Sequence, residues 1–162
     1  MTTTKHETEI IADPDLPKVT IIREFDATPD KVFPAWVDRD LFVQWIGPRT
    51  MDTRIHRWNA RTGGGYRYAS MRDGEEIATF YGAFHEVRPN ERLVQTFTWE
   101  GMPDGVSLDA TTFEELPGGR TRVTSVSVVD SMEAQAAMMA SGMEVGINEG
   151  FDKLDELLAQ KK

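Results

Sequence analysis

Cysteine is absent from the 162-residue sequence. Its absence excludes disulfides, thiolate metal ligands and cysteine nucleophiles. The sequence also has no apolar run that approaches the roughly 18 residues of a membrane-spanning helix, and its N-terminal segment lacks the apolar core of a signal peptide. We therefore expect a soluble cytoplasmic protein with no membrane partner.

The sequence has fewer basic than acidic residues. The chain has 18 Lys and Arg against 27 Asp and Glu, a net charge of −9, which argues against nucleic acid as a partner. Six arginines nevertheless cluster between residues 49 and 72, where Asp52 is the one acid. We interpret these arginines as ion-pair partners of acids on neighbouring strands, with a local anion site as the alternative.

Histidine is scarce as well. The three histidines, His6, His56 and His85, include no pair at a metal-ligand spacing, so we expect no metal and no cofactor. No G-x-S-x-G motif marks a nucleophilic serine. The sequence therefore carries no positive signal for triad hydrolysis.

A run of three glycines, Gly63 to Gly65, raises the question of a phosphate-binding loop. The run lies between two strand-like segments and has neither a following helix nor the Lys-Ser/Thr of a P-loop. We predict a tight turn or bulge in which at least one glycine has a positive φ.

Hydrophobic periodicity and turn residues divide the rest of the chain. Residues 1–17 are polar and contain Pro14 and Pro17, which predicts a flexible N-terminal arm before a single domain at 18–162. Strands are predicted at 18–25, 51–60, 64–72, 77–87, 92–100, 106–116 and 120–129, and helices near 29–36, 39–45, 131–142 and 143–160.

These elements predict an α+β fold of the helix-grip type. The seven strands should form one curved antiparallel sheet around the long C-terminal helix, with two short helices after the first strand. Such a sheet encloses a cavity against its helix, and concave apolar cavities are where small ligands bind.

Several motifs, in this order and spacing, resemble the SRPBCC or START-like superfamily, and within it the heat-shock-protein-90 ATPase activator homologue group. The resemblance covers about residues 20–160. It rests on "FDATPDKVFPAWVDRDLFVQWIGP" (25–48), "NARTGGGYRY" (59–68), "YGAFHEVRPNERLVQTFTWE" (81–100), "TTFEELPGGRTRVTSVS" (111–127) and "GFDKLDELLA" (150–159). It implies a helix-grip domain in a family whose members bind apolar ligands, cyclise polyketides or stimulate a chaperone ATPase.

Ten residues are candidates for the wall of the cavity. Alternation along a strand places Arg54 and His56 on the same face as Trp58, a face that either lines the cavity or points to solvent. Aromatic rings and flexible methionines suit an apolar ligand. The full set of ligand-binding candidates is Arg54, His56, Trp58, Tyr66, Tyr68, Phe97, Trp99, Met139, Met143 and Ile147.

Glycines recur every four residues at Gly142, Gly146 and Gly150, on one face of the predicted C-terminal helix. A face without side chains either approaches the sheet closely or leaves room for a ligand.

Three functions remain open on the sequence alone. The first is binding of a small apolar or aromatic molecule. The second is a polyketide-cyclase-like or hydratase-like enzyme, with Arg54, His56, Tyr68 or Tyr81 as acids and bases. The third is a protein-binding module whose partner is a chaperone ATPase, and a homodimer partner also stays open.

Overall fold

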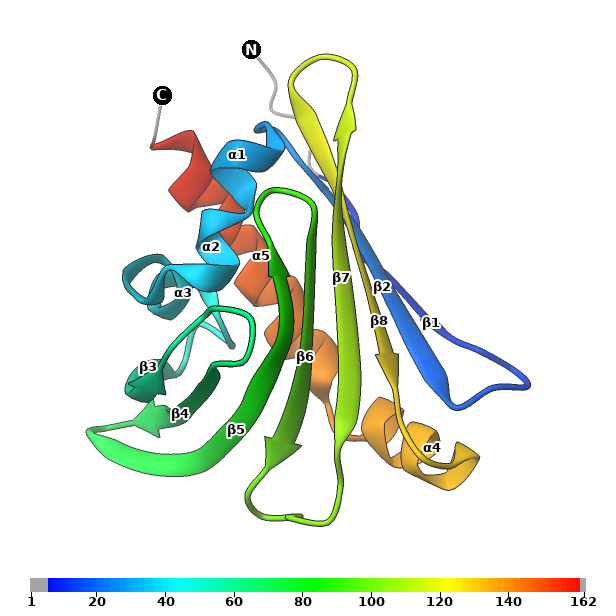
Figure 1. Ribbon diagram of the computed structural model, residues 1–162. Helices are drawn as coiled ribbons and strands as arrows, with labels where there is room; N and C mark the ends of the chain where they lie inside the picture. Colours follow the sequence, from blue (N-terminus) through cyan, green and yellow to red (C-terminus); the bar gives the residue numbers. More distant parts are fainter. Residues whose placement is uncertain (1–5, 161–162) are drawn as a thin grey trace.

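A single antiparallel sheet curves around the C-terminal helix in the computed structural model, which describes residues 6–160 (Figure 1). The eight strands follow the order β1-β2-β8-β7-β6-β5-β4-β3 across the sheet. They are β1 (Glu9–Ala12), β2 (Lys18–Phe25), β3 (Asp52–Trp58), β4 (Gly65–Arg72), β5 (Glu75–Arg88), β6 (Arg92–Trp99), β7 (Ser107–Leu116) and β8 (Arg120–Val128). The predicted α+β helix-grip fold is confirmed.

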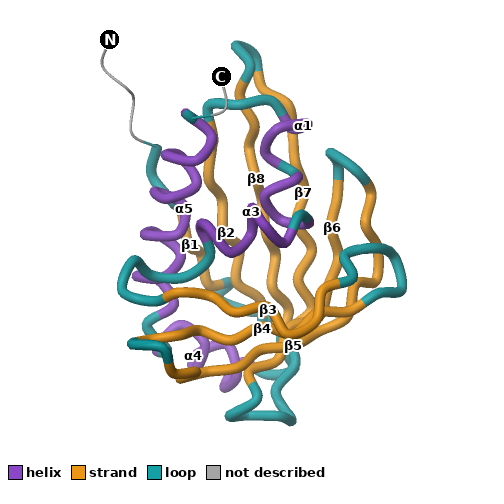
Figure 2. Tube along the Cα trace, turned by 90° about the vertical axis from the view of Figure 1, so that its left-hand side faces the viewer, coloured by secondary structure: helices purple, strands orange, loops and turns teal. Residues whose placement is uncertain are grey.

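Five helices within residues 6–160 complete the fold. They are α1 (Pro29–Val32), α2 (Pro34–Val37), α3 (Arg39–Trp45), α4 (Met132–Ala140) and α5 (Met143–Ala159). Figure 2 shows β3 and β4 running across the direction of β7 and β8, so that the sheet bends around the space beside α3 and α5. Within residues 6–160 no helix is long and apolar enough to cross a membrane.

The strand count differs from the prediction of seven because part of the expected N-terminal arm is a strand. In β1, Ile10 pairs with Ile21 of β2. The connection between them is closed by the carboxylate of Asp13, which accepts hydrogen bonds from the backbone N–H groups of Asp15 and Leu16. The pair of β-branched residues in "EIIA" is enough to add an edge strand once this turn brings it alongside β2.

The glycine run forms the predicted turn. Gly63 has a φ of +86°, and its N–H donates to the carbonyl of Phe84 at 2.9 Å. The N–H of Gly64 donates to the carbonyl of Arg61 at 2.8 Å. Because carbonyls already occupy these two N–H groups, they are not arranged to receive a phosphate.

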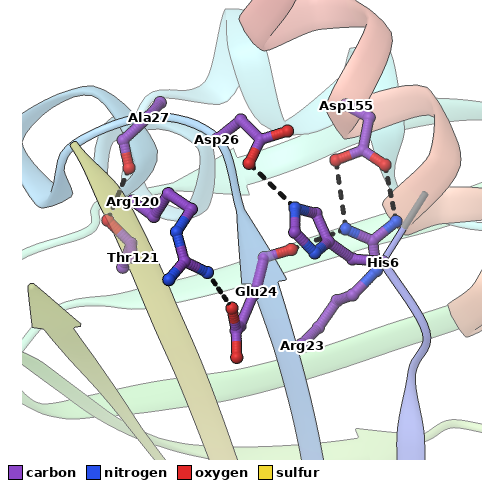
Figure 3. A network of polar contacts seen from close by, with 8 residues as sticks. All are labelled: His6, Arg23, Glu24, Asp26, Ala27, Arg120, Thr121 and Asp155. Atoms are coloured by element: carbon purple, nitrogen blue, oxygen red, sulfur yellow. Dashed lines mark hydrogen bonds and ion pairs between the residues drawn. The ribbon is translucent and has the colours of Figure 1, made fainter. Parts of the chain in front are cut away.

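Arg23 fastens the C-terminal helix to the sheet (Figure 3). Its side chain is only 1% exposed, and its two terminal nitrogens contact the carboxylate of Asp155 on α5 at 2.5 and 3.1 Å. The guanidinium also lies 4.9 Å from the ring centroid of Phe25, which packs edge-on against Phe151 of α5.

The glycine face of α5 approaches the end of α3 and the chain that follows it. A Cβ on Gly150 would lie 2.9 Å from the carbonyl oxygen of Trp45, and one on Gly146 would lie 3.6 Å from Pro48. These glycines therefore permit close packing of α5 against residues 45–48. They do not open space for a ligand.

Candidate functional site

A cavity of about 300 Å³ lies between the inner face of the sheet and helices α3, α4 and α5. Its walls come from elements far apart in the sequence. The lining residues are Ile21, Trp36, Phe42, Trp45, Ile46, Trp58, Tyr66, Tyr68, Gln95, Phe97, Ser107, Asp109, Thr111, Ser125, Ser127, Met138, Met143 and Ile147.

One side of the cavity is an aromatic wall, which consists of Trp36, Phe42, Trp45, Trp58, Tyr66 and Tyr68. Its rings pack on one another, with centroid distances such as 4.7 Å between Trp36 and Trp45 and 4.8 Å between Phe42 and Trp58. Two of the indole N–H groups donate to backbone carbonyls: that of Trp45 to Ala35, and that of Trp58 to Val37. The wall therefore offers the cavity mainly ring surface.

The opposite side is a polar floor on the sheet, made of Gln95, Ser107, Asp109, Thr111, Ser125 and Ser127. Cross-strand pairing sets their positions, because Asp109 on β7 faces Gln95 on β6 and Ser127 on β8. The next inward pair along these strands is Thr111 and Ser125, whose hydroxyl oxygens are 2.6 Å apart.

Alternation explains why this floor is polar only at one end. The inward-facing positions of β7 run Ser107, Asp109, Thr111 and Phe113, so the side chains change from polar to apolar along the strand. Phe113 belongs to the buried core together with Leu154 of α5. The change from polar to apolar marks where the core under the helices replaces the cavity.

Asp109 is the one charged side chain among the cavity-lining residues of the described chain. Its Oδ1 atom is buried and has no hydrogen-bond partner within residues 6–160. Burial raises the pKa of this carboxyl, and the hydroxyls of Ser127 and Ser107 beside it partly oppose the rise.

The two tyrosines of the aromatic wall are poor proton donors. Burial raises the pKa of Tyr66 and of Tyr68 above the usual tyrosine range, and the negative charge of Asp109 adds to the effect. The hydroxyl of Tyr66 donates to the carbonyl of Thr96 at 2.6 Å. It reaches that oxygen over Gly82, where a Cβ would lie 1.9 Å from the same oxygen.

Six of the ten predicted site residues line the cavity: Trp58, Tyr66, Tyr68, Phe97, Met143 and Ile147. The other four, Arg54, His56, Trp99 and Met139, lie outside it. Sequence reasoning also missed the polar floor. Its signal was present in "SLDAT" and "SVS", where polar and apolar residues alternate on adjacent strands.

A β-bulge removes Arg54 and His56 from the cavity. The register shifts between Ile55, which pairs with Tyr68, and Arg57, so simple alternation fails before Trp58 is reached. Arg54 and His56 instead contact Glu76 at 3.0 and 2.9 Å. His56 and then Arg54 hold the pKa of that carboxyl below its usual value.

Trp99 and Met139 miss the cavity for different reasons. Trp99 is the last residue of β6 and is 45% exposed. Met139 is 40% exposed, whereas its neighbour Met138 lines the cavity, because one residue turns the side chain by about 100° around a helix. Tyr81, a catalytic candidate, is 41% exposed and lies outside the cavity lining.

Ion pairs account for several of the clustered arginines. Besides Arg54, Arg67 contacts Glu100 at 2.7 Å, and Arg49 pairs with Glu156. These three arginines are ion-pair partners of acids, as predicted, but the acids do not lie on neighbouring strands: β4 separates Arg54 on β3 from Glu76 on β5, and Glu156 lies on α5. In the part of the chain that the structure describes, no group of three or more His, Asp or Glu side chains is placed to hold a metal ion.

Comparisons with known proteins agree with this architecture. A family model described as Activator of Hsp90 ATPase homolog 1-like protein matches residues 26–159. No curated protein matches the chain.

Solved structures match nearly the whole chain. The crystal structure of a protein from Rhodobacter sphaeroides is 22% identical, with a TM-score of 0.85 over 95% of this chain and 99% of that chain. A solution structure from Arthrobacter aurescens is 26% identical, with a TM-score of 0.84 over 94% of this chain and 91% of that chain. The crystal structure of a Mycobacterium smegmatis protein is 25% identical, with a TM-score of 0.83 over 93% and 96% of the two chains.

Proposed function

This chain belongs to the family of Activator of Hsp90 ATPase homolog 1-like proteins, and we propose that it binds a small apolar or aromatic molecule in the cavity between the sheet and α5. The observation that carries the proposal is the cavity itself. Its volume of about 300 Å³ falls at the lower end of the range for ligand pockets, and seven aromatic residues line it.

The cavity lining lacks most of the acids and bases that catalysis would use, which favours binding over catalysis. Arg54, His56 and Tyr81, which acid–base catalysis would have used, lie outside it. Burial raises the pKa of Tyr68 far above neutral pH, which makes its hydroxyl a poor acid or base. No His, Lys or Arg side chain lines the cavity beside Asp109 in the described chain.

A protein partner, whether a chaperone ATPase or a second copy of the chain, requires an apolar docking surface. Val106, Leu108 and Val128 are exposed apolar side chains on or beside β7 and β8. Leu108 pairs with Val128 across β7 and β8, so these residues form one small apolar patch. A small apolar patch is ordinary on protein surfaces, and the cavity is therefore the more specific feature.

The test is to fill the cavity without changing the outer surface. Ile147 on α5 lines the cavity, whereas Val145 on the same helix is 57% exposed. Ile147→Trp should weaken binding of the neutral fluorescent probe N-phenyl-1-naphthylamine at least tenfold, about 1.4 kcal/mol. Val145→Trp, which adds the same bulk outside, should leave the affinity unchanged.

Circular dichroism is the control that checks whether both variants fold. If the probe binds the folded Ile147→Trp variant as tightly as it binds the unchanged chain, the ligand site lies elsewhere. If the unchanged chain binds no apolar probe, the proposal of a ligand-binding protein is wrong and a protein partner becomes the better hypothesis.

A further inference from the structure

Asp109 is the feature of the cavity that apolar ligand binding leaves unexplained. A carboxyl group that loses contact with water costs free energy unless hydrogen bonds or an opposite charge compensate for it. Its Oδ1 atom is buried and unpaired within the described chain, and the side chains beside it are the neutral hydroxyls of Ser107 and Ser127. The compensation from the protein is therefore incomplete.

The charge balance of the cavity indicates what is missing. The lining residues include no Lys, Arg or His, so the described part of the cavity carries one negative charge when Asp109 is ionised and no positive charge. Electrostatic complementarity then favours a ligand with one positive charge. The net charge of −9 on the whole chain favours the approach of the same kind of ligand.

The aromatic wall suits a cation for a second, independent reason. The face of an aromatic ring is electronegative and attracts an ammonium group within about 6 Å of its centroid, most strongly when the ring is that of Trp. Three of the four tryptophans of the chain, Trp36, Trp45 and Trp58, line this cavity. Both the aromatic rings and the carboxylate of Asp109 would stabilise an organic ammonium ion in this cavity.

The geometry points to a small organic amine, with an apolar or aromatic body and one ammonium group, as the ligand of this cavity. The inference rests on the proposed function and specifies its ligand class. The ammonium group lies toward Asp109 on the polar floor, where Ser107, Ser127 and Gln95 accept further hydrogen bonds from it. The same ammonium group faces the rings of the aromatic wall, and the apolar body packs against Met143 and Ile147 of α5.

The experiment compares three ligands of similar size and different charge on the full chain. They are 2-phenylethylamine, which is a cation at neutral pH, 2-phenylethanol, which is neutral, and 3-phenylpropionate, which is an anion. Binding is followed by calorimetry and by the fluorescence of the cavity tryptophans. The amine should bind at least tenfold more tightly than the alcohol, and the anion should bind most weakly.

Asp109→Asn removes the charge and keeps the shape of the side chain. This variant should lose at least tenfold in affinity for the amine while its affinity for the alcohol changes by less than threefold. Glu114→Gln is the matched control, because Glu114 lies on the same strand, is exposed and faces Arg122. It should leave the affinity for all three ligands unchanged.

The outcomes separate this inference from the proposed function. If alcohol and amine bind equally well, or if Asp109→Asn binds the amine as tightly as the unchanged chain, the amine assignment is wrong while apolar binding stands. If none of the three ligands and no neutral apolar probe binds, both proposals fail. The ligand comparison on the unchanged chain decides the matter even if Asp109→Asn does not fold.

Discussion

Replacing Asp155 by asparagine tests whether the Arg23 ion pair holds the C-terminal helix on the sheet. Arg23 is buried on β2, and Asp155 on α5 contacts both of its terminal nitrogens. Asparagine keeps the size of the side chain but removes the charge and one of the two acceptor oxygens. The change therefore leaves a buried cation with its main partner neutralised.

The expected cost follows from the burial of each partner. Removing one side of a fully buried ion pair costs about 3–5 kcal/mol. Asp155 is 35% exposed, and Asp152 offers a second carboxylate 3.5 Å from the same guanidinium. Both facts reduce the loss, and the carbonyl of Glu24 still accepts a bond from Arg23 at 2.7 Å. We expect Asp155→Asn to lower the free energy of unfolding by about 2–3 kcal/mol.

Urea denaturation followed by tryptophan fluorescence measures the effect. Asp152→Asn is the matched control, since it removes the weaker contact on the same helix and should cost less than about 1 kcal/mol. Arg23→Met should cost less than Asp155→Asn, because it leaves Asp155 partly solvated rather than leaving a buried cation unpaired. A loss below about 0.5 kcal/mol for Asp155→Asn, or equal losses at both aspartates, would refute the argument.

Three further predictions concern the cavity and its surroundings. The pKa of Asp109 is raised in the folded chain, so the folded chain binds more protons than the unfolded chain at pH values between the ordinary and the raised pKa. The free energy of unfolding should therefore fall as the pH rises through that window. Urea titrations of Asp109→Asn should not show this fall. Gly82→Ala should lower the free energy of unfolding by about 2–3 kcal/mol, because its Cβ would collide with the carbonyl of Thr96 and displace the Tyr66 hydroxyl. Gln135→Ala should cost about 1–2 kcal/mol and speed hydrogen exchange in α4, since its buried amide nitrogen contacts the carbonyls of Asp13 and Leu16 in the turn after β1 and of Lys18 at the start of β2.

Periodicity and turn residues predicted most of the fold because they act locally. The turn at Gly63 depends on residues within a few positions of it, and the structure contains it. The β1 strand was missed because it is only four residues long and lies between polar segments. It exists because it pairs with β2.

The cavity was harder to predict than the fold. Tyr66 and Tyr68 both line the cavity because β4 alternates without interruption between them. Whether Arg54 and His56 face the cavity or solvent stayed open, because a bulge is a property of two paired strands and the sequence of β3 alone does not show it. Asp109 was missed because an acid in a strand normally faces solvent, although its alternation with Phe113 places it on the inner face.

Two aspartates in this domain illustrate opposite uses of the same side chain. Asp155 faces a buried cation, so its charge is compensated within the fold and its removal should destabilise the chain. Asp109 has no such cation, and its uncompensated charge opposes folding at neutral pH. A ligand that supplies the missing charge should therefore stabilise the folded chain, and its effect on the melting temperature should disappear in Asp109→Asn. The stability that this carboxylate costs the free protein is then recovered when an ammonium group is bound beside it.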